Sequence, residues 1–272
     1  MMRLPPTWRD VLAPYTTRLQ KGGALLNPLR QLSLAWAEAS GGLVHPVISG
    51  ALGLTSRREA DVVRRAFVPR LVRSQPPNLW RTAAILERHR NAPSLVVPLH
   101  YYATACAEPL LSDFVEQFLY PLAGTGHEVG TVHVLRFIEQ QPEERFPAGR
   151  WTKTVSTKVA RGLLAALRGY GVLAGRNTKR IAAVRLSGEA FALLARIRAE
   201  LGFRGEASID DPVWRLFFLD AKAVQGLFAE AAAERLLVFN AAGRVVRVEF
   251  PSSSLEEYAS LIASGTPAAV GV

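Results

Sequence analysis

Residues 151–181 read WTKTVSTKVARGLLAALRGYGVLAGRNTKRI, and this stretch decides the fold that we expect. Its first part predicts a helix from about Thr152 to Gly169, because apolar side chains recur at steps of three and four residues. The inward face of this helix consists of Val155, Val159, Leu163, Ala166 and Tyr170. The opposite face carries Lys153, Thr157, Arg161 and Arg168, with Lys158 beside them. We therefore expect a helix that is apolar on one side and cationic on the other.

A β-hairpin is predicted directly after this helix. Two short β-prone runs, 171–174 and 180–186, flank a turn that contains glycine and asparagine. The tip of the hairpin is polar and carries Arg176, Asn177, Thr178 and Lys179, followed by Arg180. Upstream, residues 130–141 place Val132, Leu135 and Ile138 at helical spacing. Helix, helix and hairpin in this order are typical of a winged helix.

The positive charge of the chain is concentrated in the same region. The formal net charge is +10 and the isoelectric point is about 10.3. Residues 145–187 contain ten Lys and Arg residues and neither Asp nor Glu, whereas the rest of the chain balances 23 basic against 23 acidic residues. A requirement for solubility alone would spread the excess over the whole surface. Concentration in one segment indicates a local positive potential for a polyanion.

These features predict an interface with double-stranded DNA. A recognition helix needs cations for phosphates and short polar side chains near its N-terminus, and the hairpin contacts the adjacent backbone. The residues expected to bind DNA are Arg150, Lys153, Thr157, Lys158, Arg161, Arg168, Arg176, Asn177, Lys179 and Arg180. For any single one of them, the alternative is a solvated helix face or loop.

A second basic run lies earlier in the chain, where Arg57, Arg58, Arg64 and Arg65 are interspersed with Glu59 and Asp61. We expect a helix that begins near Arg57, with Ser56 and Glu59 as a capping box, and that ends or kinks at Pro69. One interpretation is that these arginines extend the DNA footprint. Because the acids among them can pair with arginines within the helix, we favour the other interpretation, a solvated face.

The whole chain is expected to be mainly α with small β-hairpins. Further helices are predicted near 79–90, 99–107 and 110–120, and a glycine-rich break follows at 124–126. Ser187, Asp220 and Ser254 are predicted helix caps, and a second hairpin is expected around Ala241 to Arg244. We divide the chain into an N-terminal helical domain (1–126), a winged-helix-like basic DNA-binding domain (127–204) and a small C-terminal helix and hairpin unit (205–272).

The chemistry of an enzyme is missing from the sequence. The five histidines are scattered, Cys106 is the single cysteine, and neither a phosphate-binding loop nor a nucleophile elbow occurs. We therefore expect no catalytic residues, no metal and no cofactor. Neither a signal peptide nor a membrane span is evident, because the most apolar stretch, 95–111, is interrupted by proline, histidine and glutamate. A cytoplasmic protein is expected.

Four segments resemble the BrxA family of BREX bacteriophage-exclusion systems: Tyr15 to Leu26, Leu110 to Val115, Trp151 to Leu173, and Val238 to Phe250. The resemblance implies a small, basic, largely helical DNA-binding protein without enzymatic activity. Members of the family have also been likened to the RNA-binding antitermination protein NusB.

The leading hypothesis is a non-enzymatic component of a BREX phage-defence system that binds double-stranded DNA mainly through the backbone. One alternative is an RNA-binding protein of NusB type. Another is an assembly adaptor whose basic face contacts an acidic protein of the defence complex. Other BREX subunits are expected partners, and an enzyme is the interpretation that we favour least.

Overall fold

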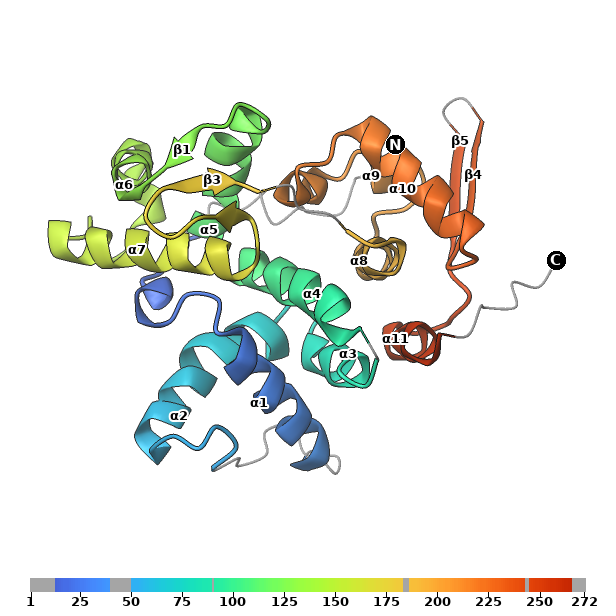
Figure 1. The fold of residues 1–272 in the computed structure, drawn as a ribbon, viewed down its shortest axis with the longest axis horizontal. Coiled ribbons are helices and arrows are strands. Elements are labelled where there is room, and N and C mark those ends of the chain that lie inside the picture. Colours follow the sequence, from blue (N-terminus) through green and yellow to red (C-terminus); the bar gives the residue numbers. More distant parts are fainter. Residues whose placement is uncertain (1–12, 40–49, 90, 183–185, 243–244, 266–272) are drawn as a thin grey trace.

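The computed structural model describes residues 13–39, 50–89, 91–182, 186–242 and 245–265. Most of these residues are helical, and two small antiparallel sheets accompany the helices (Figure 1). This confirms the expected mainly α class with small hairpins.

The N-terminal part is a set of helices in which η2, α3 and α5 pack against α4. In chain order they are η1 (Arg18–Lys21), α1 (Leu26–Ala39), α2 (Ser56–Val62), η2 (Val63–Val72), α3 (Leu79–Leu86), α4 (Ala92–Ala107), α5 (Pro109–Phe114), η3 (Val115–Leu119) and η4 (Tyr120–Leu122). The elements η2 and η3 are π-helical continuations of α2 and α5. The predicted helices at 99–107 and 110–120 therefore exist, but the first of them begins earlier and continues through Pro98.

The capping box predicted for α2 is wrong, and of the end or kink predicted at Pro69 the end is wrong. Glu59 is buried and accepts hydrogen bonds from the backbone nitrogens of Ala51 and Leu52, at 3.2 and 3.4 Å, so it does not form a capping box with Ser56. The helix also does not end at Pro69, because it widens into the π-helical turns of η2 and continues to Val72. A wider turn changes the hydrogen-bond pattern around a residue that lacks an N–H group.

The central part has the elements β1 (Glu128–Val129), α6 (Thr131–Gln140), η5 (Glu143–Arg145), α7 (Lys153–Gly169), β2 (Leu173–Ala174) and β3 (Lys179–Ile181). The strand order in the sheet is β1-β3-β2, and both pairings are antiparallel. Both predicted helices and the hairpin are present. Strand β1 was not predicted from the sequence, since two residues are too few for a periodic pattern.

The C-terminal part consists of α8 (Gly188–Glu200), α9 (Glu206–Ile209), η6 (Pro212–Phe217), α10 (Ala221–Ala233), β4 (Val238–Ala242), β5 (Val245–Glu249) and α11 (Leu255–Ser264). All three predicted caps are confirmed: the side chains of Ser187, Asp220 and Ser254 accept hydrogen bonds from the third backbone N–H that follows each of them. Strands β4 and β5 pair in register, with Val238 opposite Glu249.

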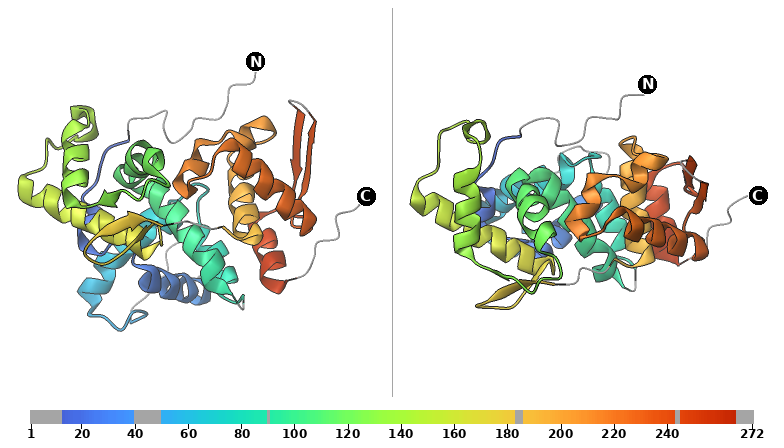
Figure 2. Two further views of the ribbon diagram at one scale, coloured as in Figure 1. Left: turned by 45° about the horizontal axis from the view of Figure 1, so that its top comes forward. Right: turned by 90° about the horizontal axis from the view of Figure 1, so that it is seen from above.

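One buried apolar cluster runs from Tyr15 to Ile262. Figures 1 and 2 show α4 between a group formed by α6, α7 and the small sheet and a group formed by α8, α10 and α11. Helix α11 packs against α3, and η1 packs against α7. The division into three domains stays a prediction, and its parts share this core.

Candidate nucleic-acid interface

Helix α7 is capped by Thr152, whose hydroxyl accepts a hydrogen bond from the backbone nitrogen of Val155 at 3.4 Å. Its inner face is buried and includes Val159, Leu163, Ala166 and Leu167. The outer face exposes Lys158, Arg161, Ala165 and Arg168, while Lys153 is exposed in the first turn. We call Lys158, Arg161 and Arg168 the α7 stripe. Burial of the apolar face fixes the rotation of the helix, so these three cations point toward solvent.

No residue in the described ranges forms an ion pair with a member of the α7 stripe or with Lys153. Thr157 is half-buried, and its hydroxyl donates to the carbonyl oxygen of Lys153 at 2.8 Å. Its oxygen can still accept a hydrogen bond, but its donor is satisfied within the helix. Among the described residues, no ion pair therefore neutralises the charge of the stripe.

The hairpin β2–β3 lies beside α7 (Figure 1). Gly175 has a φ of +99°, and a side chain at this position would collide with the backbone carbonyl of Thr178. The tight turn leaves Arg176, Asn177 and Thr178 exposed at its tip, and Lys179 half-buried. The ammonium of Lys179 donates to the carbonyl of Arg176 at 3.2 Å, which holds part of the tip together.

Besides Thr157 and Lys179, two further predicted site residues have partners within the protein. Arg150 donates to the carbonyl oxygens of Ile138, Glu139 and Gln141, at 3.2, 3.4 and 2.5 Å, so its guanidinium caps the C-terminal end of α6. Arg180 forms an exposed ion pair with Glu128 of β1 at 2.8 Å. Their binding to DNA stays a prediction, and the exposed cations of α7 and of the hairpin tip are better placed for an external partner.

Acidic residues from other segments contact the acid-free stretch 145–187 in the folded protein. Arg145, the first cation of the acid-free stretch, is nearly buried and pairs with Asp113 at 2.8 Å. Its guanidinium carbon also lies 5.0 Å from the centre of the Tyr15 ring, and the Tyr15 hydroxyl donates to the same carboxylate at 2.8 Å. Arg145 therefore stabilises the fold. Arg185, at the other end of the stretch, lies outside the described residues.

The N-terminal segment crosses α7 at two glycines, and this crossing was not predicted from the sequence. A Cβ on Gly162 would collide with the backbone carbonyl of Leu19, and a Cβ on Gly169 would lie 2.6 Å from the Cβ of Ala24. The two glycines are seven residues apart, so they lie on the same face of the helix. Paired glycines at this spacing inside an otherwise regular helix were the available signal.

Two buried side chains hold this segment in place. Arg70 of η2 donates to the carbonyl oxygens of Gly23 and Ala24, at 3.2 and 3.1 Å. The hydroxyl of Tyr170, directly after α7, donates to the Ala24 carbonyl at 3.0 Å. Burial raises the pKa of Tyr170 above its ordinary value, so the hydroxyl keeps its proton. The segment is therefore fixed to η2 and to α7 at the same point.

The cysteine and three of the histidines show no arrangement for catalysis or metal binding within the described ranges. Burial raises the pKa of the Cys106 thiol to about 11, which leaves it a poor nucleophile. His100 is fully buried, whereas His127 and His133 lie against each other with ring centres 5.4 Å apart. The described residues contain no group of three His, Cys, Asp or Glu side chains that could hold a metal ion.

None of the helices in the described ranges combines the length and the apolar character that crossing a membrane requires.

Comparison with known proteins gives one family and one solved structure. The BrxA family matches residues 13–198, about two thirds of the chain. No curated protein matches. A crystal structure of an uncharacterized protein from Magnetospirillum magneticum is similar, with 18% sequence identity and a TM-score of 0.48 over 75% of this chain and 97% of the other.

The family match contains three of the four segments that resemble BrxA, including all of α7. The fourth segment, the hairpin at Val238 to Phe250, lies beyond residue 198, so the match does not support that part of the resemblance. The extent of the match is nevertheless decisive, and the chain belongs to the BrxA family, which places it in BREX phage defence.

Proposed function

We propose that this protein binds double-stranded DNA as a component of a BREX system and catalyses no reaction itself. The observation that carries the proposal is the α7 stripe: three exposed cations on one helix face, without acidic partners among the described residues and next to a polar hairpin tip. Such a surface lowers the free energy of a bound polyanion by releasing its condensed counterions.

The order of elements supports a winged-helix mode of binding. β1, α6, α7, β2 and β3 follow one another along the chain, with β1 against β3 in the sheet. In this mode α7 is the recognition helix and lies along the major groove. Arg176 and Asn177 at the hairpin tip then contact the adjacent backbone. Contacts of this kind position the protein on any sequence, so the proposed binding is largely independent of base sequence.

Membership of the BrxA family supports other BREX subunits as partners. In this proposal, those subunits carry out the chemical reactions of the defence complex, and this protein binds the DNA. The scarcity of catalytic chemistry around the α7 stripe fits that division of labour.

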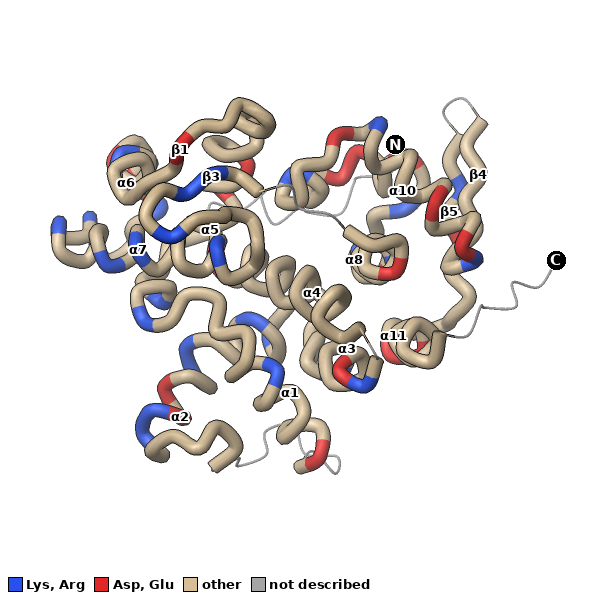
Figure 3. Tube along the Cα trace, viewed as in Figure 1, with Lys and Arg blue, Asp and Glu red and all other residues tan. Residues whose placement is uncertain are grey.

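The test is a pair of matched double variants. R161A/R168A removes two cations of the α7 stripe, whereas K222A/R247A removes the same charge from α10 and β5, on the opposite side of the molecule (Figure 3). The affinity for a duplex is measured by fluorescence anisotropy at several salt concentrations, after circular dichroism has confirmed that both variants are folded. We expect R161A/R168A to reduce the slope of log K against log salt by about one for each phosphate that the variant no longer neutralises.

An unchanged slope in folded R161A/R168A contradicts the proposal, and so does an equal reduction in K222A/R247A. Competition between labelled duplex and structured RNA tests the alternative of an RNA-binding protein, which equal or stronger binding of RNA supports. Capture of a protein partner that survives nuclease and moderate salt, without duplex binding, supports the assembly adaptor.

A further inference from the structure

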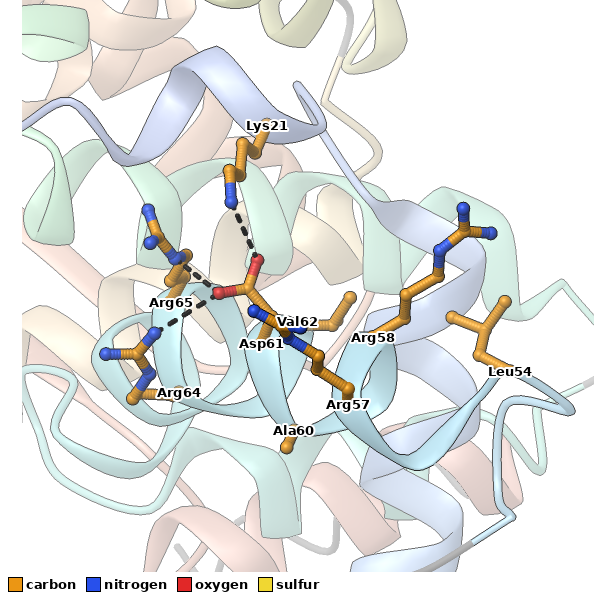
Figure 4. A pocket seen from close by; sticks show the side chains of 9 residues that line it. All are labelled: Lys21, Leu54, Arg57, Arg58, Ala60, Asp61, Val62, Arg64 and Arg65. Atoms are coloured by element: carbon orange, nitrogen blue, oxygen red, sulfur yellow. Dashed lines mark hydrogen bonds and ion pairs between the residues drawn. The ribbon is translucent and has the colours of Figure 1, made fainter.

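A second cationic site lies on α2, outside the predicted interface. The groove has a volume of about 760 Å³ (Figure 4). Its lining residues are Lys21, Leu54, Arg57, Arg58, Ala60, Asp61, Val62, Arg64 and Arg65. We call it the α2 groove. It combines five cations with one carboxylate, which gives a local excess of four positive charges.

Asp61 pairs with part of this charge. Its carboxylate lies 2.5 Å from Nε of Arg65, 3.3 Å from Nη2 of Arg64 and 3.6 Å from Nζ of Lys21. Desolvation acts to raise the pKa of Asp61, but the hydrogen bond and charge of Arg65, together with Lys21, outweigh it and lower the pKa. The carboxylate thus stays ionised and orients three cations around itself, as the expected pairing within the helix implies.

Arg57 and Arg58 are different, because both are exposed and neither has an acidic partner within the described ranges. Figure 4 shows the guanidinium group of Arg58 apart from the Asp61 cluster, on the side toward Leu54, whereas Arg57 overlaps Asp61 in this view. Glu59, which the sequence placed beside them, is turned inward to the backbone of Ala51 and Leu52. The arginines are solvated as predicted, but Glu59 takes no part in the expected pairing, and one carboxylate cannot neutralise five cations.

The α2 groove is rigidly connected to α7. Lys21 is the last residue of η1, and Leu19 in the same turn lies against Gly162 of α7. Arg70 and Tyr170 then fix the next residues, Gly23 and Ala24, to η2 and to the end of α7. Figures 1 and 3 show η1 between α7 and α2, with Lys and Arg on all three. Two cationic sites therefore lie on either side of one anchored segment.

We propose that the α2 groove binds backbone phosphates of the same duplex that α7 holds, so that the footprint on DNA extends across η1. This inference rests on the proposed function. Arginine presents a planar fork of N–H donors that matches the oxygens of a phosphate. A duplex carries a phosphate charge about every 1.7 Å of its axis, so a strand that leaves α7 has further charges to offer a neighbouring cationic groove.

The central variant is R57A/R58A, which removes the two unpaired arginines and leaves the Asp61 cluster intact. We expect the salt slope on a long duplex to fall by about one for each phosphate that is no longer neutralised, up to about two. Duplexes are shortened in steps to about one helical turn, about 10 base pairs. On the shortest duplex we expect R57A/R58A to match the wild type while R161A/R168A stays impaired. K222A/R247A is again the control for net charge.

D61N gives a test with the opposite sign. Removal of the carboxylate charge frees Lys21, Arg64 and Arg65 and adds one positive charge to the α2 groove. We expect tighter binding of the long duplex and no change on the shortest one. A variant that merely loosened the fold would weaken binding at every length.

The outcomes separate the two proposals. A wild-type slope in R57A/R58A at every duplex length, together with an unchanged affinity in D61N, overturns the α2 groove even where R161A/R168A has a reduced slope. A reduced slope in R57A/R58A with a wild-type slope in R161A/R168A overturns the function proposed for α7, and with it the shared duplex. A reduction in R57A/R58A that persists on the shortest duplex also contradicts a footprint that extends across η1.

Discussion

Gly162 of α7 lies against the backbone carbonyl of Leu19, so closely that a side chain at position 162 has no room. The contact joins the N-terminal segment to the helix that carries the proposed interface. It places a glycine in a helix interior, where glycine costs about 1 kcal/mol relative to alanine. The close approach of two backbones explains why glycine stands there despite that cost.

We therefore expect Gly162→Ala to destabilise the protein by about 1–3 kcal/mol, because the new methyl group forces the two backbones apart. The matched control is Gly226→Ala in α10, where the new methyl group meets no atom within 4 Å. Helix propensity predicts that this control gains up to about 1 kcal/mol. Urea denaturation measures both changes, and a stabilised Gly162→Ala variant contradicts the close approach.

Arg150 is expected to stabilise the fold through its hydrogen bonds rather than to bind DNA. Arg150 donates hydrogen bonds to three carbonyl oxygens at the end of α6. We expect Arg150→Ala to lower the free energy of unfolding by about 1 kcal/mol, because solvent exposure weakens each of these hydrogen bonds. Arg150→Lys keeps the charge but removes the fork, so it should be destabilised to a similar extent and keep the wild-type salt slope. A lysine variant as stable as the wild type would show that the cap contributes nothing.

His100 predicts a pH dependence of stability. It is fully buried, and neither ring nitrogen has a hydrogen-bond partner among the described residues. Burial, followed by the charges of Arg70 and Arg30, lowers its pKa to about 3. In the unfolded chain His100 is protonated below about pH 6.5, whereas in the folded chain it stays neutral until about pH 3. The free energy of unfolding therefore falls as the pH drops below 6.5.

Between about pH 6.5 and about pH 5 this effect amounts to about 2 kcal/mol at most. His100→Leu has no proton to bind, and we expect its unfolding free energy to decline less over the same range. Chemical denaturation at the two pH values measures the difference. Equal declines in the wild type and in His100→Leu would mean that His100 titrates normally in the folded protein.

Much of the fold around α7 could be predicted from local sequence. The bounds of α6 and α7 differ from the predicted ones by about one residue, because an amphipathic period reports which side of a helix is buried. The caps at Ser187, Asp220 and Ser254 were equally local. Cations along α7 were predicted to face outward for the same reason.

Relations between distant segments could not be predicted in this way. Glu59 and Arg145 are the clearest examples, since each has partners that only the folded chain brings near. The pair Arg198 and Asp211 is another: both side chains are buried, with Nε of Arg198 2.6 Å from the carboxylate, although helical spacing alone gave no reason to bury an arginine. Periodicity describes one element at a time, whereas such pairs depend on packing between elements.

The packing of α11 against α3 has a consequence for synthesis. The two helices are separated by more than 160 residues, so α3 leaves the ribosome long before its partner exists. Until translation reaches α11, the nascent chain shows an uncovered apolar flank on α3. Synthesis of α11, rather than collapse of the first half of the chain, covers this side of α3, and until then the exposed apolar surface is open to chaperones.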